Sequence, residues 1–188
     1  MMLVKPSPVG IDIPVQRMQM FLYPSLKKQW NITNDTDYDS YGRAYKNQTA
    51  DGYSPEVFKG TDAKKIDYKE VLYDDNLKAL SFFLLGDVTK YDSGNSTAPV
   101  SLFFLVNVQS LKPAATYRAD EEIRNDVERL CQNERFGFTM TEMVIGFDQV
   151  FREFSGWRKT QGMKYADMHP RHCFRLNFQV LYDINECY

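Results

Sequence analysis

Two nearly continuous apolar segments constrain the fold of this 188-residue chain more than any other feature. They run from Leu80 to Gly86 and from Val100 to Val108, and a polar turn at residues 91–97 lies between them. This arrangement predicts a hairpin with a long loop. Strands that are apolar on both faces need cover on both sides, so a helix or a second sheet must pack over the hairpin.

The last strand of the chain follows a different pattern. In the segment from Cys173 to Tyr182, aromatic and branched residues alternate with mostly polar ones. The alternating apolar set is Phe174, Leu176, Phe178, Val180 and Tyr182. A period of two places this set on one face, which is typical of an antiparallel strand with one buried side.

Two long helices are expected. The segment from Ala119 to Gln132 opens with three acidic residues, which suit a helix N-terminus, and carries an apolar stripe that would cover the sheet. The segment from Ile13 to Trp30 has a stripe at spacings of three and four, with Asp12 as its expected cap. Pro24 predicts a kink or a break in this N-terminal helix.

The remaining segments complete an α+β domain. Residues 1–12 are expected to be an extended arm that reaches a neighbour, and residues 31–75 an acidic, loop-rich insertion with three short strands. Residues 136–144 alternate like a strand, and residues 147–154 are expected to form a short helix. The prediction is one domain over residues 13–188, with a largely antiparallel sheet covered by one main helix, an N-terminal helix and long loops.

Composition and motifs exclude several classes of function. The net charge of −2 is unlike that of a general nucleic-acid binder, and the apolar runs are far too short to span a bilayer. The three cysteines form no disulfide framework, and no phosphate-binding glycine loop occurs. We therefore expect no cofactor.

The loop before the last strand is the one place where chemistry is conceivable. It holds both histidines, His169 and His172, beside Asp167 and Cys173, but their spacing matches no closed zinc site. Adjacent residues of a strand point to opposite faces, so His172 is poorly placed to activate the Cys173 thiol. The acidic pairs elsewhere lie in polar loops without an apolar frame, so we expect neither catalytic nor metal-binding residues.

Charge is distributed unevenly along the chain. Residues 152–175 hold six Lys or Arg against two Asp or Glu, whereas residues 31–75 hold ten Asp or Glu against six Lys or Arg. An acidic face on one copy can pair with a basic face on the next, and head-to-tail contacts of this kind generate rings. The expected subunit or channel contacts in the basic loop are Arg158, Lys159, Lys164, His169 and Arg171.

Several short segments of the sequence resemble those of a known protein family. They are Tyr68 to Val71, Leu80 to Phe83, Arg118 to Glu122, Phe154 to Trp157, and Asp167 to Pro170 before Phe174 to Phe178. Across residues 12–185 the chain resembles head-to-tail neck, tail-completion and tail-terminator ring proteins of tailed bacteriophages. The resemblance is closest to versions from phages of Bacteroidetes, including the crAss-like group.

The resemblance implies a tail-terminator-like subunit that is assembled in the bacterial host cytoplasm into the virion neck or tail. It implies a homo-oligomeric ring, twelvefold or alternatively sixfold, that contacts the portal or adjacent tail proteins. Double-stranded DNA would pass through its channel without sequence-specific binding. The alternatives are a small hydrolase with a Cys/His or carboxylate site, and a host-side adaptor or binding module.

Overall fold

The computed structural model describes residues 1–59, 68–71, 76–87, 89–92, 94–132, 135–160 and 168–183, with backbone alone for 158–160. The strands are β1 Met2–Leu3, β2 Tyr38–Thr49, β3 Gly52–Phe58, β4 Tyr68–Glu70, β5 Ala79–Leu85, β6 Lys90–Asp92, β7 Asn95–Asn107, β8 Phe138–Ile145 and β9 Arg171–Asp183. The helices are α1 Asp12–Gln29, α2 Val108–Leu111, α3 Asp120–Cys131, α4 Phe147–Val150 and α5 Ser155–Thr160, with short 3-10 turns at Asp35–Asp37 and Arg135–Gly137.

One mixed sheet organises the chain, in the order β4-β3-β2-β5-β7-β9-β8, with β1 added beside β2 and β6 beside β7. The β1–β2 and β2–β5 pairs are parallel and the others antiparallel, so the predicted α+β class with a largely antiparallel sheet is confirmed. The predicted central hairpin is also confirmed, because β5 pairs with β7 along seven residue pairs from Ala79↔Val106 to Leu85↔Val100.

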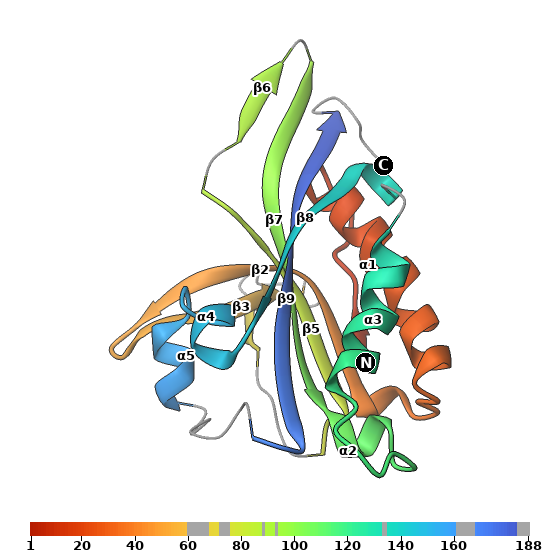
Figure 1. Cartoon of the computed structure of the whole chain (residues 1–188). Helices are drawn as coiled ribbons and strands as arrows, with labels where there is room; N and C mark the ends of the chain where they lie inside the picture. The colour runs from red at the N-terminus through yellow and green to blue at the C-terminus, as the bar shows by residue number, and fades with distance from the viewer. Residues whose placement is uncertain are drawn as a thin grey trace.

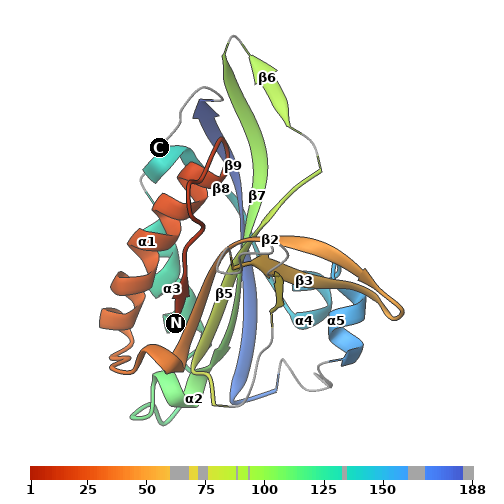
Figure 2. The same cartoon turned by 180° about the vertical axis from the view of Figure 1, so that it is seen from behind.

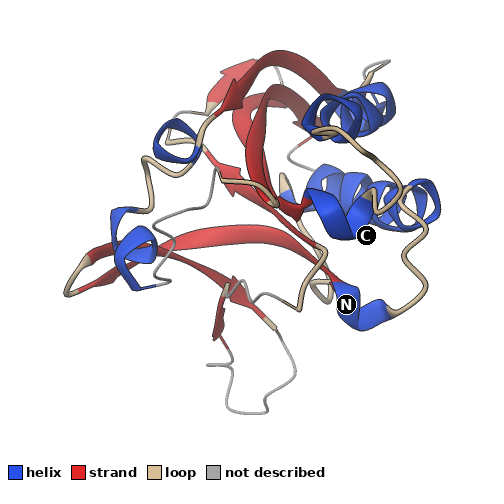
Figure 3. Cartoon of the chain, turned by 60° about the horizontal axis from the view of Figure 1, so that its bottom comes forward, coloured by secondary structure: helices blue, strands red, loops and turns tan. Residues whose placement is uncertain are grey.

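The sheet is covered on both faces, as the two apolar strands require (Figures 1 and 3). Alternate residues of β7 divide between two clusters: Leu102 and Phe104 belong to the one under α1 and α3, and Phe103 and Leu105 to the one under α4 and α5. The alternating set of β9 is confirmed as well, because its apolar members from Phe174 to Val180 lie on the α1–α3 side. Two helices, rather than one main helix, therefore cover that face.

A buried carboxylate joins the two covering helices. Asp126 of α3 accepts hydrogen bonds from Trp30 Nε1 and Gln29 Nε2, each at 3.1 Å, and pairs with Lys112 Nζ at 3.1 Å. Arg129 also donates to it, at 2.9 Å. A buried carboxylate is tolerated only when partners of this kind satisfy it, so Asp126 fixes the relative position of α1 and α3.

Of the kink or break expected at Pro24, the break is wrong, because α1 runs without interruption from Asp12 to Gln29. Proline has no N–H, so Pro24 cannot donate to the carbonyl of Met20. Both residues lie on the exposed side of the helix, where water can donate to that carbonyl instead. The Asp12 cap is also wrong, since Asp12 lies inside the helix and its carboxylate binds cations instead of the helix N-terminus.

The acidic segment is less loop-rich than expected. Its described residues form the twelve-residue strand β2, the seven-residue strand β3 and the short strand β4, and β2 lies inside the sheet between β3 and β5. A register shift between Ser40 and Arg43 breaks the alternation of β2, which is why the period of two is hard to read there. The sequence prediction of a short helix at residues 147–154 is correct only in part, because α4 ends at Val150 and α5 begins at Ser155.

Candidate functional site

The residues predicted as contacts are only partly described. Arg158 and Lys159 lie in α5, where the structure describes the backbone alone, and Lys164 lies outside the described residues. His169 is exposed, and Arg171 is half-buried at the start of β9, opposite Asn107 of β7. The loop end is held there because the amide of Val108 donates to the Pro170 carbonyl at 2.7 Å.

The predicted pairing of opposite charges between copies stays a prediction, while parts of the acidic and basic segments contact each other within one chain. Helix α5 packs against β3, as Figure 1 shows. A side chain at Gly52 would clash with Ser155 Oγ and would lie 2.9 Å from the Gly156 amide nitrogen, so the two segments approach closely at this glycine. Several acidic side chains are also paired internally, among them Asp35 with Lys27 and Asp37 with Lys78.

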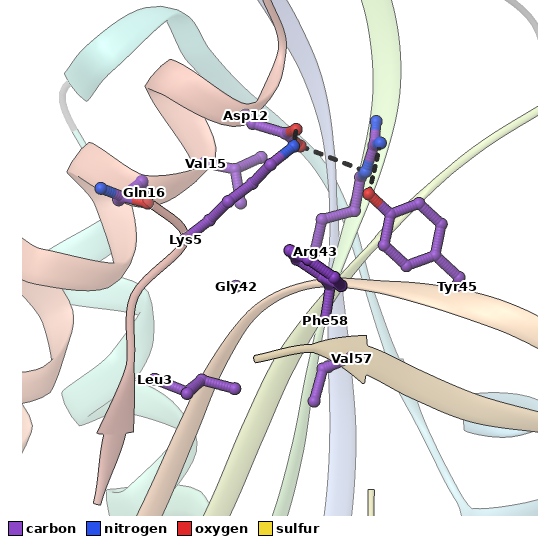
Figure 4. A pocket seen from close by; sticks show the side chains of 10 residues that line it. All are labelled: Leu3, Lys5, Asp12, Val15, Gln16, Gly42, Arg43, Tyr45, Val57 and Phe58. Atoms are coloured by element: carbon purple, nitrogen blue, oxygen red, sulfur yellow. Dashed lines mark hydrogen bonds and ion pairs between the residues drawn. The ribbon is translucent and has the colours of Figure 1, made fainter. Parts of the chain in front are cut away.

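The N-terminal arm is likewise attached to its own chain. Asp12 binds Lys5 and, at 3.1 Å, Arg43, whose guanidinium donates to the Tyr45 hydroxyl at 2.7 Å (Figure 4). Buried Gln19 donates to the backbone carbonyls of Leu3, at 2.8 Å, and Ser40, at 2.9 Å. The cavity beside Lys5, Asp12, Arg43 and Tyr45 has about 30 Å³, which suits a water molecule and not a substrate.

The last strand separates the residues that might have formed a nucleophile pair. Cys173 is fully buried in the cluster under α4 and α5, whereas His172 points to the opposite side of the sheet and lies beside α3. Arg124 contacts His172 Nε2 at 3.0 Å, and Asp120 Oδ2 lies 3.8 Å from Nδ1. A guanidinium only donates, so it occupies the lone pair that a general base would use. Cys173 and His172 therefore do not form a catalytic pair.

We expect the two described cysteines to be inert in the folded protein. Burial, with the charge of Glu128, raises the pKa of Cys131 to about 12, and Cys173 is fully buried. Iodoacetamide at pH 8, followed by peptide mass spectrometry, should label neither residue before unfolding and both in denaturant. Cys187, which lies outside the described residues, is replaced by Ser to simplify the readout. Rapid labelling of Cys173 in the folded state would contradict this burial and restore a possible nucleophile.

A more prominent surface feature lies where β7 leaves the sheet at its C-terminal end. An open cavity of about 430 Å³, which we call the α2 hollow, forms there beside helix α2 at the bottom of Figure 1. It is lined by Val108, Gln109, Lys112, Pro113, Ala115, Thr116, Tyr117, Arg118 and His169. Of the two predicted contact residues whose side chains the structure describes, His169 lies in the lining of this cavity and Arg171 does not.

The α2 hollow is firmly built, and both cationic side chains of its lining already have carboxylate partners. Lys112 and Arg118 belong to its lining, and among the described lining residues there is no carboxylate. Lys112 is held from behind by Asp126, and Arg118 by Asp120. The Tyr117 hydroxyl donates to Glu122, which steadies the outer wall. A pre-formed concave surface with a few placed polar groups is a typical binding site.

The other end of β7 carries a projection. Strand β6 pairs with the start of β7 in the register Lys90↔Thr97, Tyr91↔Ser96 and Asp92↔Asn95, and this β6–β7 hairpin extends beyond the body of the protein (Figures 1 and 2). Every residue of β6 is exposed, and the Tyr91 side chain is 75% exposed. Sequence reasoning identified this segment only as a polar turn. The sequence feature that could have identified the projection is Tyr91, an aromatic residue within that polar turn.

Within the described ranges, no three His, Cys, Asp or Glu side chains come together as metal ligands. No described helix is long and apolar enough to cross a membrane. Comparison with protein-family models and with curated protein sequences finds no match to this chain. The function must therefore be argued from the two ends of β7 and from the residues of the sequence.

Proposed function

We propose that this protein is a structural virion subunit that forms a homo-oligomeric ring in the phage portal–tail connector. The observation that carries the proposal is the pair of unlike features at opposite ends of β7, namely the projecting hairpin and the α2 hollow. A surface that differs from the surface it binds gives heterologous, head-to-tail contacts, and such contacts close into rings when the rotation between copies allows.

The titratable side chains in the rest of the described chain also support an assembly role. The described side chains that come nearest to a catalytic arrangement already have partners. His172 contacts Arg124, Asp120 forms an ion pair with Arg118, and the Cys173 thiol is buried. The fold that we propose is tail-terminator-like, as the resemblance in the sequence implies. The ring would be twelvefold or sixfold and would join the portal or an adjacent tail protein.

We place the basic segment of residues 158–171 toward a neighbouring subunit or the DNA channel. Its positive charge suits the phosphate backbone of passing double-stranded DNA, which is attracted without regard to sequence. Weak, exchangeable contacts are what a channel requires, since the DNA must move through it.

Neutralising this segment tests its part of the proposal. A phage carrying Arg158→Gln, Lys159→Gln and Lys164→Gln should give a reduced yield of infectious particles, because assembly or DNA passage is weakened. The matched control removes three positive charges from exposed positions elsewhere, at Lys28, Lys46 and Arg135. A yield equal to that of the control would remove the basic segment from the proposal, while the ring itself is tested separately below.

A further inference from the structure

The two histidines of the chain lie near the start of β9 in different environments. His169 is exposed in the turn before the strand, whereas His172 is only 3% exposed and lies on the α3 side of the sheet. The His172 imidazole stacks on Phe174, with centroids 5.7 Å apart, and its cross-strand neighbour on β7 is Val106. In such an apolar frame an extra charge is costly, so the polar groups that face the imidazole decide its protonation state.

Helix α3 supplies charged groups that face this imidazole. Arg124 Nη1 lies 3.0 Å from Nε2, and Asp120 Oδ2 lies 3.8 Å from Nδ1. Because a guanidinium only donates, Nε2 has to be an acceptor, which makes the imidazole neutral with its proton on Nδ1. Behind these two groups, Glu121 pairs with Arg124, and Arg118 pairs with Asp120. The structure therefore describes the neutral state of His172.

The same cluster holds an unused acceptor. Asp120 Oδ1 is buried and has no hydrogen-bond partner among the described residues. A proton on Nε2 would be repelled by Arg124, whereas the charged imidazole would be attracted to the Asp120 carboxylate. Arg124 keeps Glu121 as a partner when it leaves the imidazole. Two pairings of His172 are therefore available, and protonation selects between them.

We propose that His172 is a proton-sensitive latch between α3 and β9. In the neutral state, Arg124 donates to Nε2 and holds the helix at the start of the last strand. In the charged state Nε2 no longer accepts, so Arg124 withdraws toward Glu121 and the Nδ1–H group moves toward Asp120. The exchange extends to the α2 hollow, because Asp120 also holds Arg118 in the lining of that hollow. The latch does not depend on the oligomeric ring proposed above.

The pH dependence of stability should report the latch between about pH 5.5 and 7.5. In the unfolded chain a histidine has a pKa of about 6.5, so below that pH the unfolded chain binds a proton that the folded, neutral His172 lacks. The folding equilibrium constant should therefore fall as the pH decreases, by up to about tenfold per pH unit from this single group. The contribution is fully present above the unfolded value, and the fall ends once the charged pairing forms in the folded chain.

Urea unfolding across this pH range compares the wild type with three variants. His169→Gln is the matched control and should follow the wild type, because it keeps the buried histidine. His172→Gln should give a flatter profile, because its amide oxygen can accept from Arg124 but does not titrate. Arg124→Gln should also flatten the profile, because the charged imidazole then meets no guanidinium. Identical profiles in all four chains would overturn the latch.

Nitrogen-15 NMR of the His169→Gln chain measures the protonation of the imidazole directly, because His172 is then its only histidine. At about pH 7.5, Nδ1 should carry the proton and Nε2 should not, and a second proton should appear on Nε2 as the pH falls. This measurement changes nothing at His172, so it decides the matter even where His172→Gln does not fold. A proton on Nε2 at the higher pH would overturn the latch and leave the proposed oligomeric ring unaffected.

Discussion

Replacing Phe103 by Ala is expected to lower the free energy of unfolding by about 3–5 kcal/mol. The fully buried Phe103 ring stacks on Phe82, with centroids 4.7 Å apart, and on Phe151, with centroids 5.7 Å apart. It also meets the edge of Phe154 at 5.7 Å. Its removal leaves a cavity between the sheet and the α4–α5 layer, which these stacked rings prevent from collapsing.

Urea unfolding followed by circular dichroism measures this loss. Tyr91→Ala is the matched control, because it removes an aromatic ring that is 75% exposed and should change stability by no more than about 0.5 kcal/mol. A loss below about 1 kcal/mol for Phe103→Ala would contradict the packing of the second face.

Arg175→Ala should cost about 2 kcal/mol. Arg175 is only 4% exposed on β9, its Nη1 donates to both carboxylate oxygens of Glu153 at 3.1 and 2.9 Å, and its guanidinium lies 5.5 Å from the Phe103 centroid. The loss is smaller than the about 3–5 kcal/mol of a fully buried pair, because the Glu153 side chain keeps 22% exposure. Arg175→Met keeps most of the side-chain volume but not the charge. Compared with Arg175→Ala, it should lose the same ion pair but fewer packing contacts.

The pH dependence of stability separates charge from packing in these variants. Burial alone would raise the pKa of Glu153, but the hydrogen bond from Arg152 and the charge of Arg175 outweigh it and lower that pKa. A carboxyl with a depressed pKa stabilises the fold above its unfolded pKa of about 4.3, and that contribution is lost as the pH falls through the folded value. Arg175→Met should therefore show a shallower loss of stability with acid than the wild type. Equal slopes would show that the pair does not contribute.

Much of the core was readable from the sequence because its strands have strong periodic signals. The continuous apolar character of the segment around Phe103 required cover on both faces, and α1, α3, α4 and α5 provide it. The alternation from Phe174 to Val180 placed the buried face of β9 correctly. The polar residue Arg175 within this alternation was expected to be on a polar face, but it is buried, because Glu153 and the ring of Phe103 compensate its charge.

The candidate site was harder to predict because it depends on long-range placement. The basic loop was singled out from its charge, yet the hollow is built mainly by residues 108–118, and of the predicted contacts whose side chains are described, His169 lies in its lining and Arg171 does not. The acidic and basic segments were expected to meet between copies, which stays a prediction, and the sequence did not show that β3 and α5 of these segments also pack together within one chain. Local composition gives the sign of the charge on a surface, whereas the fold decides which surfaces already contact another part of the same chain.

Electron microscopy of the purified wild-type chain, alone and mixed with its portal-side neighbour, tests the central claim most directly. The account predicts closed rings with an open centre and twelvefold or sixfold symmetry, in which successive copies are related head to tail. Particles that remain single subunits at high concentration, and that also fail to bind the portal-side neighbour, would contradict it.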